Sequence, residues 1–195
     1  MSHLIPNVTS RTPQGERTVD LYSRLLADRI IYLGTPIDAG VANTVIAQLI
    51  HLESDKPDAP IDLYINSPGG STPATLGVYD AMGHISAPVR TTCVGEAGPT
   101  AALLLAAGEP GFRRILPHAR VLLHQPASEG RRGSIPDLIV EAEELARVRR
   151  QLESILAAHT GRTAEKVRAD TERDLVLTAD AAVEYGLVDA ILQPR

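Results

Sequence analysis

The chain has 195 residues, 44% of them hydrophobic and 22% charged, which supplies one buried core and predicts a single domain over residues 1–195. Its 19 basic and 24 acidic residues give a formal net charge of −5, which disfavours polyanion binding and therefore nucleic-acid partners. Cys93 is the only cysteine, which excludes an intrachain disulfide framework and a cysteine-built zinc site.

The N-terminal segment, residues 1–18, predicts a flexible arm, because polar and turn-forming residues interrupt every apolar run. It contains no continuous apolar stretch typical of a secretory signal. Nowhere does the chain approach the roughly 20 apolar residues of a membrane span. We therefore expect a cytoplasmic protein with no membrane partner.

Apolar runs and helical periodicities alternate from residue 29 onwards. The predicted strands cover 29–33, 61–65, 89–94, 120–123 and 187–192. The predicted helices cover 39–54, 75–85, 99–107 and 135–160, with a short helix from Thr178 to Tyr185. Strand and helix recur about every 30 residues, which predicts an α/β fold with mostly parallel pairing. The helix at 99–107 is almost wholly apolar and is expected to be buried on all sides.

The helix at 135–160 is unusually long. Pro136 suits its first turn, Gly161 suits its end, and Glu143 and Arg147 are spaced for an i,i+4 ion pair. At about 1.5 Å per residue it exceeds 30 Å, more than one small domain needs. It predicts a projecting arm that packs on another subunit; the alternative is a helix lying along its own domain.

Two glycine-rich turns follow strand ends, at 67–70 and 95–98. Glycine permits close backbone approach, so that neighbouring N–H groups can converge on one oxyanion, although purely structural glycine turns are commoner. His124 stands at the end of a strand, where it can face a cleft, and Asp174 lies in a short acidic run. Taken singly, both residues are equally compatible with ordinary surface positions.

Several motifs together resemble the Clp protease proteolytic subunit over essentially the whole chain. They are LYSRLLADRIIYLGTPI, LYINSPGGS, HQP at 124–126, LAAHTGRTAEKVRADTERD and AVEYGLVDAI. The resemblance implies the ClpP/crotonase fold and a Ser–His–Asp triad, with His124 as base and Asp174 as the acid that orients it. It also implies that Gly70 and Thr100 supply the oxyanion N–H groups.

The chain departs from this family at the nucleophile, where Pro99 replaces serine. Proline is tolerated in the first turn of a helix but has no hydroxyl for His124 to activate. The sequence therefore predicts a subunit that is catalytically silent by itself. The alternative is a serine-type endopeptidase with Thr100 or Ser71 as nucleophile, although one helical step should turn Thr100 away from His124. A crotonase-like acyl-CoA enzyme is a third, less favoured reading, because crotonases normally lack the long helix and these motifs.

The resemblance also implies partners. Stacked seven-membered rings would join through residues 135–160, with Glu172 and Arg173 linking the rings to the active site. An active Clp-type paralogue would supply serine in a mixed barrel, and a AAA+ unfoldase would use the ATP, so no cofactor or metal is expected here. The family's apolar unfoldase pocket corresponds to His51, Asp62 and Tyr64, and the first two disfavour docking of an apolar loop.

Overall fold

The computed structural model describes residues 5–12, 15–126 and 133–193. Within these ranges a seven-stranded sheet has the order β3-β4-β5-β6-β9, with β7 paired to β5 and β8 to β7. The strands are β3 (Ile30–Leu33), β4 (Ile61–Ser67), β5 (Val89–Ala97), β6 (Arg113–Ile115), β7 (Arg120–Leu123), β8 (Leu175–Thr178) and β9 (Ala190–Ile191). Every pairing is parallel except that of β7 with β8, which confirms the predicted α/β fold.

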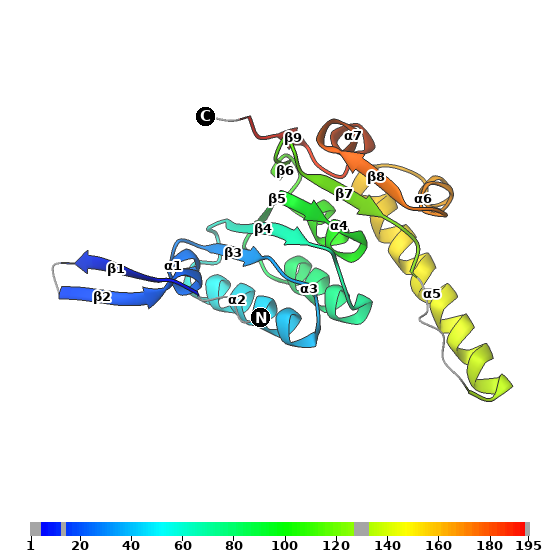
Figure 1. Cartoon of the computed structure of the whole chain (residues 1–195), viewed down its shortest axis with the longest axis horizontal. Helices are drawn as coiled ribbons and strands as arrows, with labels where there is room; N and C mark the ends of the chain where they lie inside the picture. Colours follow the sequence, from blue (N-terminus) through cyan, green and yellow to red (C-terminus); the bar gives the residue numbers. More distant parts are fainter. Residues whose placement is uncertain (1–4, 13–14, 127–132, 194–195) are drawn as a thin grey trace.

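Three helices, α2 (Ala39–Asp55), α3 (Thr72–His84) and α4 (Pro99–Ala106), lie against the sheet and enclose the core (Figure 1). Alternate residues of β4 face this core, and Ile61, Leu63 and Ile65 are 0% exposed. In α4 every residue from 101 to 106 is at most 2% exposed, which confirms the predicted burial on all sides. No helix in the described ranges is long and apolar enough to cross a bilayer.

Helix α5 (Ile135–Thr160), which we call the handle, projects well beyond the sheet as predicted (Figure 1). It begins where Asp137 accepts hydrogen bonds from the Ser134 amide and hydroxyl, and it ends at Gly161, whose φ is +70°. Its C-terminal part packs on α4 and α6 (Ala164–Asp170). The predicted Glu143–Arg147 pair is wrong, because the Arg147 guanidinium forms two hydrogen bonds of 2.7 Å with Glu144 instead.

The described part of the N-terminal segment forms an antiparallel hairpin of β1 (Asn7–Thr12) and β2 (Gly15–Asp20), followed by α1 (Leu21–Ala27). Regular structure here was not predicted. Thr9 and Thr18 are opposite each other in the pairing register, with a hydroxyl–hydroxyl distance of 2.9 Å. Mobility of the arm stays a prediction, and its residues 1–4 and 13–14 lie outside the described ranges.

At the C-terminal end, α7 (Ala179–Tyr185) begins at its Thr178 cap and ends at Gly186, as predicted. The predicted strand at 187–192 is shorter in the structure: Ala190–Ile191 pairs with β6, and the flanking Asp189 and Leu192 N–H groups donate to the Arg113 and Ile115 carbonyls. Leu187 instead donates its N–H to the carbonyl of Ala182 and completes the helix end, with its side chain buried.

Candidate functional site

The two glycine turns meet at the carboxyl ends of the adjacent strands β4 and β5. The Gly98 N–H donates to the Ser67 carbonyl at 2.8 Å, and a Cβ at Gly98 would lie 1.9 Å from the Pro68 carbonyl oxygen. No side chain fits there, so glycine at 98 is what allows the turns to touch. This contact places the N-terminus of α4 beside Gly69 and Gly70.

Pro99 is the first residue of α4, directly after the Gly98 cap. Its ring and His124 line the same pocket, of about 360 Å³. The residue that the family resemblance puts in the nucleophile position therefore lines the same pocket as the predicted base. It presents a hydrocarbon ring to that pocket.

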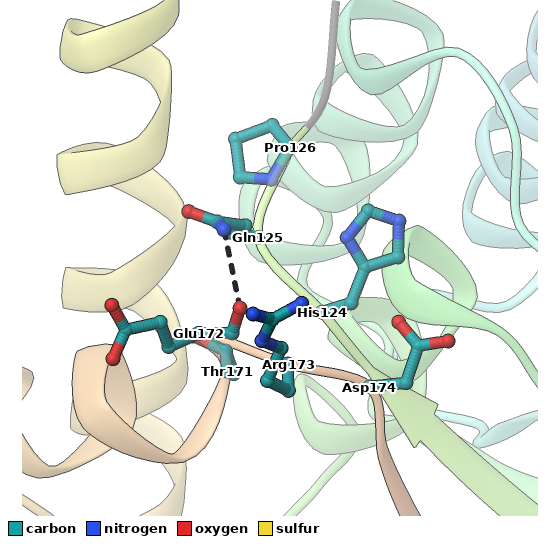
Figure 2. A pocket seen from close by; sticks show the side chains of 7 residues that line it. All are labelled: His124, Gln125, Pro126, Thr171, Glu172, Arg173 and Asp174. Carbon is teal, nitrogen blue, oxygen red and sulfur yellow. Dashed lines mark hydrogen bonds between the residues drawn. The ribbon is translucent and has the colours of Figure 1, made fainter.

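His124 and Asp174 are brought to the same place by the antiparallel pairing of β7 with β8. Leu123 is paired with Leu175, so the next step of the register sets His124 opposite Asp174. His124 is half-buried and Asp174 is exposed. Among the described residues no hydrogen bond joins the two side chains, and Figure 2 draws none. The structure therefore places the predicted base and the predicted acid as neighbours that no hydrogen bond joins within the described ranges.

Thr100 also faces this pocket, and its hydroxyl has a partner that the sequence did not reveal. The Gly70 N–H donates to the Thr100 Oγ1 at 2.9 Å. Both residues predicted to supply oxyanion N–H groups are therefore in contact through a side chain. Spacing along the sequence carries no signal for this contact, since the residues are 30 positions apart.

Neither the Ser71 hydroxyl nor the Cys93 thiol is placed as a nucleophile beside His124. Ser71 caps α3, where its hydroxyl accepts from the Ala74 N–H at 3.5 Å, and it is not among the described residues that line the pocket of Pro99 and His124. Cys93 is 0% exposed in β5, and burial raises the pKa of its thiol to about 11. Cys93 therefore stays protonated at neutral pH and provides no thiolate nucleophile.

The same pocket has an apolar wall that sequence reasoning missed. Leucines from three elements contribute to its lining: Leu103 of α4, Leu123 of β7, and Leu152 and Leu156 of the handle. The i,i+4 spacing of the two handle leucines was the available signal. The arrangement can hold an apolar group in the pocket that His124 also lines.

Glu172 and Arg173 lie in the loop between α6 and β8, beside His124 and Asp174 in an open cleft (Figure 2). Gln125 ties this loop to the end of β7: its N–H donates to the Thr171 carbonyl at 3.0 Å and its Nε2 to the Glu172 carbonyl at 3.3 Å. The loop that carries Asp174 and the strand end that carries His124 are thus held together by contacts to the backbone.

The residues of the predicted unfoldase pocket lie on two different elements of the described structure. His51 is exposed on α2 and lines a groove with residues of α1 and α2, among them Leu26. Asp62 and Tyr64 are half-buried on β4, on the sheet face opposite its core residues. In the described ranges no group of three or more histidine, cysteine or acidic side chains is placed to hold a metal ion.

Comparison with known proteins decides the family. A family model described as Clp protease matches residues 13–195. The chain belongs to the Clp protease family. This assignment confirms the predicted family, and with the observed architecture it confirms the ClpP fold.

Relatives within the Clp protease family cover nearly the whole chain. ATP-dependent Clp protease proteolytic subunit 1 of Nocardia farcinica is 60% identical over 100% of this chain and 98% of its own length. ATP-dependent Clp protease proteolytic subunit 2 of Streptomyces avermitilis is 56% identical over 100% of this chain and 97% of its own length. A Streptomyces coelicolor protein named putative ATP-dependent Clp protease proteolytic subunit-like is 57% identical over 99% of this chain and 92% of its own length.

Proposed function

We propose that this Clp-family chain is a proteolytic-subunit-type component of an ATP-dependent protease barrel and is catalytically silent by itself. The observation that carries the proposal is Pro99, which stands in the nucleophile position and lines the same pocket as His124. A base raises the reactivity of a hydroxyl by removing its proton, and a pyrrolidine ring has no such proton. Without an acceptor for the substrate acyl group, covalent catalysis stops before its first step.

The remaining candidates for a nucleophile do not replace it. The Thr100 hydroxyl is committed to the Gly70 N–H, and among the described residues it has no hydrogen bond to His124. Ser71 is committed to its helix cap. A serine-type endopeptidase working through either hydroxyl would need a hydrogen bond to His124 that neither makes among the described residues.

We propose that assembly with other subunits provides the catalytic serine that this chain lacks. Stacked seven-membered rings would bury the outer part of the handle, where Ile135, Leu138, Ile139 and Val140 are between 42% and 75% exposed. In a mixed barrel the serine would come from an active Clp-type paralogue, and ATP would be used by a AAA+ unfoldase. Because His51 lies on α2, and Asp62 and Tyr64 lie on the face of β4 opposite its core residues, we propose that a docking pocket containing all three would be completed between two neighbouring subunits.

The test is a peptidase assay of the purified chain, alone and mixed with an active Clp-type subunit, beside a Pro99→Ser variant. We expect background turnover for the unaltered chain, and turnover in the mixed barrel that follows the active subunit. We expect Pro99→Ser to gain activity that is lost again in a Pro99→Ser/His124→Ala double variant. Turnover by the unaltered chain that disappears with Thr100→Val or Ser71→Ala would instead establish the substitute nucleophile.

A further inference from the structure

We propose that the Thr100 hydroxyl is a second barrier to acyl transfer in this chain, separate from the missing serine: it occupies the Gly70 N–H needed by an oxyanion. The inference deepens the proposed function and rests on it. It implies that serine at position 99 restores only part of the activity.

The contact is built into the backbone around it. Gly69 has a φ of +89°, and a Cβ there would lie 2.9 Å from the Thr100 Oγ1 and 3.1 Å from its amide nitrogen. Glycine at 69 therefore leaves the space in which the hydroxyl reaches the Gly70 N–H at 2.9 Å. The hydroxyl sits where the two turns meet, at the start of α4.

The amides on either side of Gly70 have other acceptors. The Gly69 N–H donates to the Ser67 Oγ at 3.1 Å, and the Ser71 N–H donates to the Ile37 carbonyl at 2.8 Å. Gly70 is the amide of this turn that meets the Thr100 side chain. It lines the pocket together with Thr100 and His124, where a substrate carbonyl would have to lie.

The second N–H group of the pair belongs to Thr100 itself. Thr100 is the second residue of α4, and the first N–H groups of a helix have no carbonyl acceptor within that helix. The Thr100 N–H is therefore available to an external oxygen. In the native chain the pair is thus reduced to one open donor. A substrate carbonyl must displace the threonine hydroxyl before both donors can stabilise its developing negative charge.

The size of the effect follows from oxyanion sites in general. Removing one donor costs about 10²–10³ in kcat. A hydroxyl that can be displaced costs less, because the ionised oxygen is the stronger acceptor. We therefore expect a barrier of about tenfold in kcat, below the cost of losing the donor outright.

Threonine offers a matched pair of replacements, valine with the same shape and no hydroxyl, and serine with the hydroxyl kept. In the Pro99→Ser background we expect kcat of the Thr100→Val variant to exceed that of the Thr100→Ser variant, which keeps the hydroxyl, by about tenfold. In this reaction the hydroxyl introduced at position 99 adds to the peptide carbonyl, and His124 takes its proton and returns it to the leaving amine. Equal kcat for the valine and serine variants, where both turn over, would overturn the proposal.

A second readout does not depend on turnover. Hydrogen–deuterium exchange of the Gly70 amide, resolved by fragmentation mass spectrometry on the otherwise native chain, should be faster with Thr100→Val than with Thr100→Ser or no change. The Gly69 and Ser71 amides serve as internal controls and should not change. Equal Gly70 exchange in the native and valine forms contradicts the proposal even if no serine variant turns over. Activity of the unaltered chain would instead contradict the silent-subunit proposal and leave this exchange test valid.

Discussion

Pro99 is compatible with the fold, although it has no hydroxyl for the catalysis that we propose is lost. The first helical residue loses nothing by lacking an N–H, so proline there leaves α4 intact, as the structure shows. The neighbouring position has the opposite character. Gly98 has no room for a side chain, because the Pro68 carbonyl occupies the space of a Cβ.

Gly98→Ala should therefore be strongly destabilising, by about 2 kcal/mol or more in the free energy of unfolding, since two backbone segments must separate. Gly83→Ala is the matched control, because Gly83 lies in α3 with no atom within 4 Å of its added Cβ. We expect the control to be neutral or to stabilise by up to about 1 kcal/mol. Urea unfolding at one protein concentration measures both, and equal free energies for the two variants would contradict the tight contact.

At the scale of elements, the base of the handle is fixed by a buried carboxylate. The Glu153 side chain is 5% exposed and pairs with Arg149 at 2.7 Å and with Arg168 at 2.8 Å. Burial by itself raises the pKa of Glu153, but hydrogen bonds from Arg168 and Arg149 outweigh it and hold the pKa below its usual value. The group joins the handle to α6, and thereby to the loop that carries Asp174.

Glu153→Gln should lower the free energy of unfolding at neutral pH by about 2 kcal/mol, since one partner of a buried ionic cluster is lost. Because the folded-state pKa is depressed, the stabilisation is complete above the unfolded value of about 4.3 and is lost as the pH falls through the folded pKa. The difference between native and variant unfolding curves should therefore shrink in acid.

Glu144→Gln on the same helix is the control for that comparison. Its partner Arg147 and Glu144 itself are 56% and 57% exposed, so solvent screens the pair and its loss is expected to change the free energy of unfolding much less than the loss of Glu153. Similar losses for both variants at neutral pH would mean that burial of Glu153 has no special role.

Long elements were predictable from the sequence, and short ones were not. The handle and α4 carry their own signals, Pro136 and Gly161 at the ends of one and continuous apolar residues in the other. Strand β6 consists of Arg113–Ile115, and its two arginines break the apolar pattern by which a buried strand is predicted. Arg113 can lie in the sheet because it pairs with Asp189, which is distant in sequence. The hairpin at the N-terminus depends on cross-strand pairing between polar residues, which local apolarity does not record.

The sequence predicted which residues form the candidate site, but it did not predict the contacts between them. Motif resemblance located His124, Asp174 and Pro99, and the structure places all three around the pocket and its adjoining cleft. The hydrogen bond between Gly70 and Thr100 depends on how two turns pack, so it became visible only in three dimensions.

For the whole molecule, the handle's outer apolar residues predict assembly through this helix. Ile139→Asp, at a position 54% exposed, should shift stacked double rings toward single rings, because a charge would replace a buried apolar contact. Ile50→Asp, at 55% exposure on α2, is the matched control and should leave stacking intact. Native mass spectrometry measures both. Unchanged double rings with Ile139→Asp would place the ring contact elsewhere.

The most direct test of catalytic silence is covalent labelling of the native chain by a serine-directed fluorophosphonate, read by intact and peptide mass spectrometry. An active Clp-type subunit in the same mixture shows that the probe is competent. We predict that the active subunit is labelled and that this chain keeps its unmodified mass. A phosphonyl adduct on Thr100, Ser71 or any other hydroxyl beside His124 would contradict the silent-subunit proposal.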